Sequence, residues 1–84
     1  MRDFKKITIS NCIIELVPNI EKTRWLICFD GYLDPYRFCR KAKLDYTTFT
    51  QSMKDIGVYE RNGNAFIDDP EIIEPFIVAL KLML

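Results

Sequence analysis

The stretch KAKLDYTTFTQSMKDIGV, residues 41–58, decides how this 84-residue chain is organised. Apolar residues recur in it at spacings of three and four, which places them on one face of an α-helix. These residues are Tyr46, Phe49, Met53 and Ile56. Asp45 stands before the helix as an N-cap, and Gly57 follows it where a helix end favours a left-handed residue. The opposite, polar face consists of Thr47, Thr48, Gln51, Lys54 and Asp55.

A helix is also predicted upstream of this stretch, and a hairpin downstream of it. Asp34 can accept hydrogen bonds from the first amides of a helix, and Pro35 suits the first helical position because proline has no N–H. This helix should end at about Lys43. In residues 58–67, Asn62-Gly63 separates two short apolar runs, and Asn-Gly favours a β-hairpin because both central residues of a type I′ turn need positive φ.

The N-terminal part predicts β-structure. Residues 5–17 alternate β-branched and polar side chains, as a strand does, and the alternation slips at Ser10-Asn11, which indicates a β-bulge. Residues 23–29 form a second strand with Trp25 in the core. The short connection between the two runs favours an antiparallel pair over residues 5–30.

The C-terminal part predicts a helix over residues 70–83, since Asp69-Pro70 repeats the signature of a cap followed by proline. Pro75 would bend such a helix, so a start at Pro75 is an alternative. The tail of residues 76–84 is apolar nearly all round, which leaves a buried strand open as well. The residues expected in the core are Phe76, Ile77 and Leu80. Those expected to be exposed or shared in a dimer or partner interface are Leu82, Met83 and Leu84.

Together these elements predict one α+β domain over residues 1–84. A chain of this length buries only about 60% of the surface that its unfolded form exposes, so its core is small. In chain order, the domain should contain an N-terminal two-stranded β-hairpin (5–30), a helix pair (35–57), a second β-hairpin (58–67) and a C-terminal helix (70–83).

The composition argues against several classes of protein. The chain has no histidine, so the commonest general base and metal ligand is missing, and its three glycines form no phosphate-binding loop. Its three cysteines contain no CxxC pair. We therefore expect no enzymatic activity, no catalytic residue, no cofactor and no metal site. The odd cysteine count, with no signal peptide and no apolar run of about 20 residues, predicts a cytoplasmic protein without a membrane span.

Residues 35–57 resemble a helix-turn-helix. Phe38 and Cys39 match the apolar and small positions of the first helix, Leu44 matches the apolar residue before the second, and Phe49 matches the anchor five positions later. The family usually has a glycine at the turn, where this chain has Lys43. With the hairpin of residues 58–67 as the wing, the resemblance extends to winged helix-turn-helix domains. It implies a regulator that occupies a site on double-stranded DNA, and a homodimer would multiply its affinity.

The distribution of charge supports this reading. From Arg37 to Lys54 the chain has five basic residues and one acid, Asp45, which is enough to neutralise several phosphates. On the second helix Gln51 can pair with adenine, and threonine can contact phosphate or a thymine methyl group. The predicted DNA-binding residues are Arg37, Arg40, Lys41, Lys43, Thr47, Thr48, Gln51, Lys54, Arg61 and Asn64.

Other observations favour a protein-binding module. The twelve basic residues are balanced by twelve acidic ones, whereas DNA-binding modules are commonly basic, and Asp55 lies on the proposed reading face. By analogy, a small neutral domain can cap a partner protein, as inhibitors or accessory proteins of the phage or plasmid type do. The residues expected to dominate such an interface are Trp25, Tyr32, Tyr36, Tyr59 and Arg61. Both functions stay open at this level.

Overall fold

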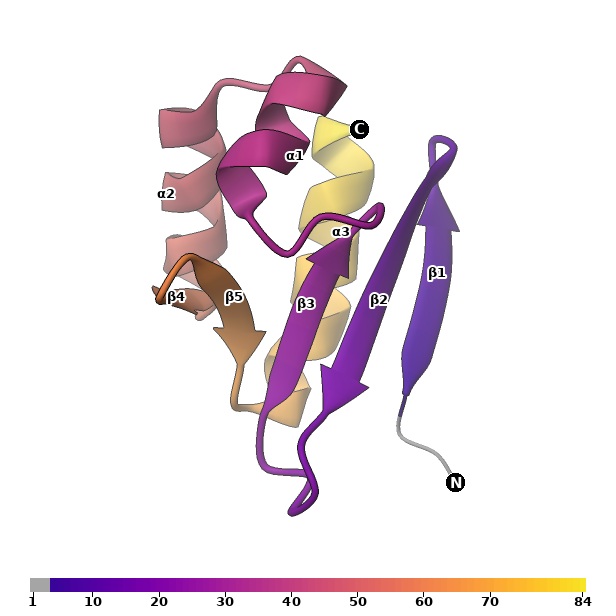
Figure 1. Cartoon of the computed structure of the whole chain (residues 1–84), viewed down its shortest axis with the longest axis vertical. Helices are drawn as coiled ribbons and strands as arrows, with labels where there is room; N and C mark the ends of the chain where they lie inside the picture. Colours follow the sequence, from indigo (N-terminus) through magenta and orange to yellow (C-terminus); the bar gives the residue numbers. More distant parts are fainter. Residues whose placement is uncertain (1–3) are drawn as a thin grey trace.

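The computed structural model describes residues 4–84, which form a five-stranded antiparallel sheet and three α-helices (Figure 1). The α+β class predicted from the sequence is therefore confirmed. The strands are β1 (Lys5–Ile9), β2 (Cys12–Pro18), β3 (Trp25–Phe29), β4 (Tyr59–Arg61) and β5 (Asn64–Ile67). The helices are α1 (Pro35–Ala42), α2 (Tyr46–Ile56) and α3 (Ile73–Met83), with a short 3₁₀ turn, η1 (Pro70–Ile72), ahead of α3. The strand order is β1-β2-β3-β5-β4.

The prediction of one bulged strand over residues 5–17 was wrong. Ser10 and Asn11 have φ values of 48° and 69°, so both lie in the left-handed region that the two central residues of a type I′ turn require. Ile9 pairs with Cys12 across this turn in the antiparallel ladder of β1 and β2. The slip in alternation thus marks a complete chain reversal, and the N-terminal unit contains three strands instead of two.

The hairpin of β4 and β5 turns at Asn62-Gly63, as predicted, and it belongs to the same sheet as the N-terminal strands. Its β5 strand pairs with β3, with Trp25 opposite Ile67 and Ile27 opposite Ala65. All four of these side chains are buried on the same face of the sheet. Because this shared apolar face needs one continuous layer, the hairpin extends the main sheet, and β4 becomes its edge.

Both caps of the helix pair form as the sequence predicts. The side chain of Asp34 accepts a hydrogen bond from the Tyr36 amide at 2.9 Å, and that of Asp45 accepts one from the Thr48 amide at 2.9 Å. Between the helices, Lys43 adopts φ 60° and ψ 43°, so it takes the left-handed conformation for which glycine is the usual residue. The connection therefore turns tightly although it lacks glycine.

The C-terminal segment is a helix, so the alternative of a buried strand was wrong. Because α3 begins at Ile73, Pro75 is its third residue. At this position of an α-helix the backbone N–H has no carbonyl partner within the helix. Proline therefore costs no hydrogen bond there, and the helix does not have to start at Pro75. Phe76 and Leu80 are fully buried as expected, whereas Ile77 is only partly buried.

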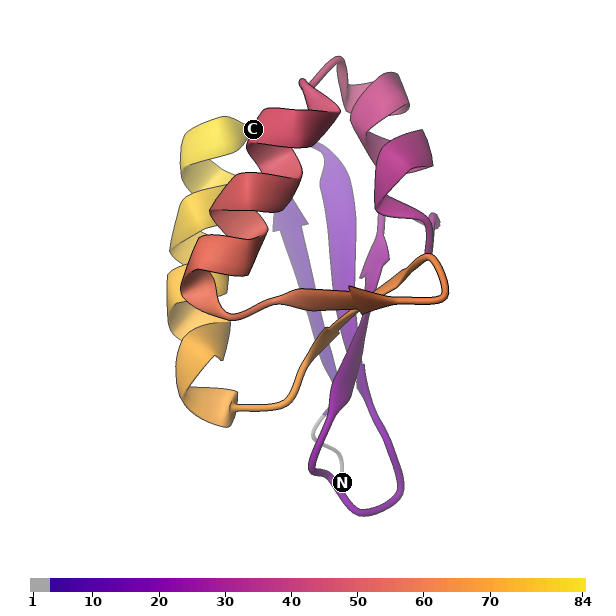
Figure 2. The ribbon, with the colours of Figure 1, turned by 90° about the vertical axis from the view of Figure 1, so that its left-hand side faces the viewer.

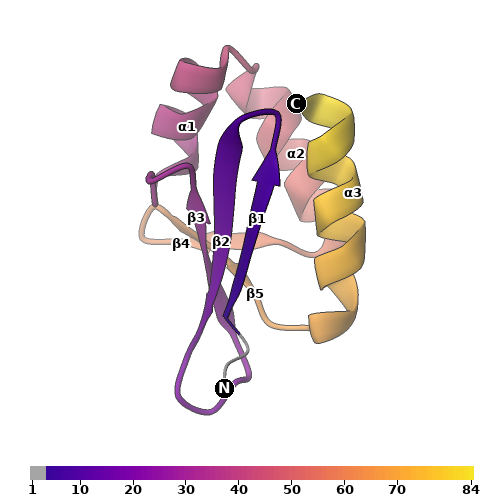
Figure 3. The same cartoon turned by 90° about the vertical axis from the view of Figure 1, so that its right-hand side faces the viewer.

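The helices cover one face of the sheet, and the other face is open. Helix α3 lies behind the strands in Figure 1 and to one side of them in Figure 3. Helix α2 packs against both α1 and α3, as Figure 2 shows. The buried side chains on the covered face of the sheet include Ile14, Leu16, Trp25, Ile27, Phe29, Ala65 and Ile67.

Phe29, the last residue of β3, contacts all three helices. Its ring centroid lies 5.2 Å from that of Phe38 in α1, 5.6 Å from that of Phe49 in α2 and 6.3 Å from that of Phe76 in α3. All four rings are almost completely inaccessible to solvent. The position of α2 relative to the sheet is therefore fixed largely by this aromatic cluster.

We predict that Phe29→Leu lowers the free energy of unfolding by about 1–2 kcal/mol, because it removes ring contacts to three helices and leaves unfilled space. The matched control is Phe66→Leu, the same change on the open face of neighbouring β5, which should cost less than about 1 kcal/mol. Urea unfolding followed by circular dichroism measures both. Equal losses would contradict a central role for Phe29.

Candidate nucleic-acid interface

The outward face of α2 is accessible to solvent. The helix is held from behind by Phe49 and Met53, which are 1% and 4% exposed. The exposed residues on its other side are Thr47, Thr48, Gln51, Lys54 and Asp55. Neither the N-terminal strands nor α3 covers them, so a DNA duplex can approach this face of α2 (Figure 2).

Two of the predicted reading residues on this face already have partners within the chain. Thr48 donates from its amide and its hydroxyl to Asp45, at 2.9 and 2.8 Å, and these bonds lower the pKa of Asp45 below its usual value. Gln51 donates through Nε2 to Asp55 at 2.9 Å. Thr48 is therefore part of the helix cap, and Gln51 must exchange Asp55 for any base it contacts.

The predicted cations of α1 are partly neutralised within the chain. Lys41 forms a close ion pair with Asp30 at the end of β3, and Arg37 lies 4.0 Å from Asp34. The guanidinium of Arg40 stands 6.0 Å above the ring of Tyr36. The structure thus draws Lys41 and Arg37 toward nearby acids.

Four predicted cations are exposed and belong to no ion pair among residues 4–84: Arg40 in α1, Lys43 in the turn, Lys54 near the end of α2 and Arg61 beside the hairpin turn. Asn64, the register partner of Arg61, is partly buried. In Figure 2 the hairpin runs from the C-terminal end of α2 to a tip below α1. The cations without an ion-pair partner therefore lie on α2 itself and on the neighbouring α1, turn and hairpin.

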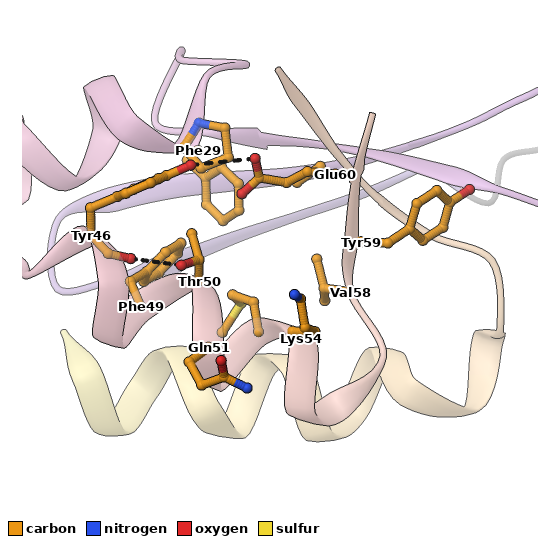
Figure 4. A pocket seen from close by; sticks show the side chains of 12 residues that line it. Phe29, Tyr46, Phe49, Thr50, Gln51, Lys54, Val58, Tyr59 and Glu60 are labelled. Carbon is orange, nitrogen blue, oxygen red and sulfur yellow. Dashed lines mark hydrogen bonds between the residues drawn. The ribbon is translucent and has the colours of Figure 1, made fainter. Parts of the chain in front are cut away.

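A hollow of about 370 Å³ separates α2 from β4 (Figure 4). Its apolar floor includes Phe29, Phe49, Met53, Val58 and Ala65. Above this floor, the hydroxyl of Tyr46 donates to the carboxylate of Glu60 at 3.4 Å, and Thr50 donates to the carbonyl of Tyr46 at 3.0 Å. Partial burial, and next the charge of Glu60, raises the pKa of Tyr46.

The contact of Tyr46 with Glu60 connects the start of α2 to the hairpin, and sequence reasoning missed it. Tyr46 was expected only to fill the apolar stripe, and Glu60 was not singled out at all. Tyr46 also packs edge-on against Tyr36 of α1, with the ring centroids 5.2 Å apart. A tyrosine at the rim of an apolar stripe was the available signal, because its hydroxyl needs a polar partner.

Asp30 joins three elements below α1. Its carboxylate accepts a hydrogen bond from the Ile13 amide at 3.1 Å and pairs with Lys41 through its other oxygen. The Lys41 contact first, and then the Ile13 amide, lowers the pKa of Asp30, while Asp30 raises the pKa of Lys41. The ion pair therefore links β2 and β3 to α1.

Among residues 4–84, no group of three or more His, Cys, Asp or Glu is arranged to hold a metal ion. Burial raises the pKa of Cys39 to about 11 and also raises that of Cys28, so both thiols are protonated at neutral pH. No helix in the described part of the chain is long and apolar enough to cross a membrane. No protein-family model, curated protein or solved structure matches this chain.

We predict that Asp30→Asn lowers the free energy of unfolding at neutral pH. The difference in free energy of unfolding between this variant and the wild type should become smaller below about pH 4. A carboxylate whose pKa is lowered on folding stabilises the protein above its unfolded pKa of about 3.9, and this stabilisation is lost as the pH falls through the lower folded value. Urea unfolding at a series of pH values measures it.

The control for this experiment is Asp68→Asn, which removes an exposed carboxylate that makes no hydrogen bond or ion pair to residues 4–84. The free energy of unfolding of this variant should equal that of the wild type at every pH. A difference in free energy of unfolding between Asp30→Asn and the wild type that stays constant below the pKa of Asp30 in the folded protein would argue against a stabilising ion pair.

Proposed function

We propose that this protein binds double-stranded DNA through α2, in the manner of winged helix-turn-helix regulators, and acts by occupying its site. The observation that carries the proposal is the exposed polar face of α2 on a helix rigidly packed from behind. A DNA major groove about 12 Å wide admits one α-helix. The left-handed Lys43 gives the tight connection between α1 and α2 that such an arrangement needs.

The charge distribution supports contact with phosphates. Residues 35–67 contain six Lys and Arg residues and three Asp and Glu residues, whereas residues 68–84 contain one and four. The net positive charge is therefore concentrated on the elements around α2. Of the predicted cations, Arg37 and Lys41 contribute least to affinity, because both already have acidic neighbours.

Base contacts would come from the middle of the outward face of α2. Thr47 makes no side-chain hydrogen bond to residues 4–84, so it is available to a phosphate or a thymine methyl group. Gln51 can offer its amide to adenine once it leaves Asp55. The carboxylate of Asp55 repels phosphates and therefore lowers the affinity for DNA of any sequence.

The test is a titration of fluorescent duplex DNA of mixed sequence, followed by anisotropy at salt concentrations from about 50 to about 200 mM. We predict that the double variant Lys54→Ala/Arg61→Ala weakens binding at least about tenfold and lowers the salt dependence, because each lost phosphate contact reduces the slope by about one. The matched control is Lys5→Ala/Lys6→Ala, the same loss of charge on β1, at the opposite edge of the sheet from β4.

The control variant should bind DNA as the wild type does. Equal weakening by the two double variants would mean that binding does not involve α2 and the hairpin. Absence of binding by the wild type at the lowest salt would overturn the proposal, since even non-specific affinity should appear there.

A second candidate function, docking to a partner protein, is favoured by the open face of the sheet. Val17, Leu26, Phe66 and Tyr59 are consecutive register partners across β2, β3, β5 and β4. The rings of Tyr59 and Phe66 stack at 5.7 Å, and the guanidinium of Arg24 lies 5.5 Å above Phe66. Aromatic and arginine side chains in one apolar row are typical of the centre of a protein interface.

The residues on the open face differ from the protein-interface residues that the sequence predicted. Trp25 is 6% exposed on the covered face, so it belongs to the core and is not a contact residue. Tyr59 lies in the row on the open face, whereas Arg24 and Phe66 were missed. The alternation of apolar and polar residues shows which side chains of a strand share a face. It does not show that β3 pairs with β5, so it could not place Phe66 opposite Leu26.

If the open face docks to a protein, Val17→Asp should abolish capture of that partner from an extract of the native host. Ile20→Asp is the matched control, because Ile20 is 94% exposed in the β2–β3 connection and the change in charge is the same. Capture measured by affinity pull-down should survive in the control. Capture by Val17→Asp at the wild-type level would exclude this face.

A further inference from the structure

The outward face of α3 carries an apolar strip that no described residue covers. Val78 is 48% exposed and Leu82 is 84% exposed, although both are large aliphatic residues. They stand one turn apart, and Pro75 precedes Val78 on the same side. Helix α2 packs against α3, and Val78 and Leu82 are exposed on a side of α3 that this contact leaves uncovered.

Two opposite charges flank this strip on one side. Glu74 and Lys81 are both exposed, and a separation of seven residues places them two turns apart on one face of the helix. The distance along the helix axis is then about 10.5 Å, which is too far for the two to pair with each other. Neither belongs to an ion pair among residues 4–84.

This pattern is complementary to itself in one orientation. If two α3 helices pack antiparallel about a two-fold axis close to Val78, Glu74 of each copy faces Lys81 of the other. The two Val78 side chains then meet at the axis, and Leu82 lies beside Pro75 of the second copy. A two-fold axis forms both ion pairs at once. A parallel two-fold arrangement would place Glu74 at the level of Glu74 and Lys81 at the level of Lys81, so neither ion pair could form.

We propose that the strip of Pro75, Val78 and Leu82 is the docking surface for a second copy of this chain, with antiparallel α3 helices and reciprocal Glu74–Lys81 ion pairs. The antiparallel helix dipoles favour the same orientation. Of the interface residues predicted from the sequence, only Leu82 lies on this surface, since Met83 and Leu84 are partly buried against the core. The proposal does not depend on DNA binding.

The experiment measures self-association of the full chain by analytical ultracentrifugation over a range of concentrations, without DNA. We predict that Glu74→Lys alone and Lys81→Glu alone each weaken the dimer at least about tenfold, because each opposes like charges at both ends of the interface. The double variant Glu74→Lys/Lys81→Glu reverses both charges and should restore dimerisation to within about threefold of the wild type.

A second pair of variants tests the apolar strip. Val78→Asp should abolish the dimer, because it places two carboxylates at the two-fold axis, whereas Ile20→Asp should leave dimerisation unchanged. All of these positions are exposed, so circular dichroism should show an intact fold in every variant. A wild-type monomer at every concentration, or a double charge reversal as weak as the single variants, would overturn the proposal.

Discussion

The arrangement of this molecule depends on the packing of one aromatic side chain at the end of β3. Phe29 contacts a phenylalanine from each of the three helices, so the sheet and all helices share a single aromatic cluster. A chain of 84 residues buries only about 60% of its potential surface, so a cluster that joins the sheet to all three helices accounts for much of a small core. The sequence supplies these rings from positions far apart, and folding brings them within a few ångströms of one another.

This cluster determines which surfaces of the molecule remain available to partners. Because Phe49 and Met53 are directed into the core, the polar face of α2 must point outward, and Tyr46 can reach Glu60 on the neighbouring hairpin. Because α3 covers only one side of the sheet, the row from Val17 to Tyr59 stays open on the other. The three exposed surfaces differ in chemistry: polar and cationic on α2, aromatic on the sheet, and aliphatic with one acidic and one basic side chain on α3.

Sequence reasoning succeeded where the signal is local and failed where two distant segments meet. Asp34, Asp45 and Asn62-Gly63 act on amides and dihedral angles within three or four residues, so their roles can be read directly from the sequence. The slip at Ser10-Asn11 has the same local pattern for a bulge and for a hairpin, and only the ladder of β1 with β2 distinguishes them. The free or paired state of each predicted cation likewise required the fold, since Asp30 and Lys41 meet only in three dimensions.

The sequence by itself determined the bounds of α1 and α2, the turn at Asn62-Gly63, the α+β class and the amphipathic division of α2, because each follows from short-range geometry and the period of apolar residues. Only the tertiary structure decided that β5 joins β3, that Phe66 lies on the open face beside Leu26, and that Leu82 lies outside the core while Met83 packs against it. These outcomes depend on which apolar faces meet. That choice is made by the collective packing of the whole core, and no local stretch of sequence encodes it.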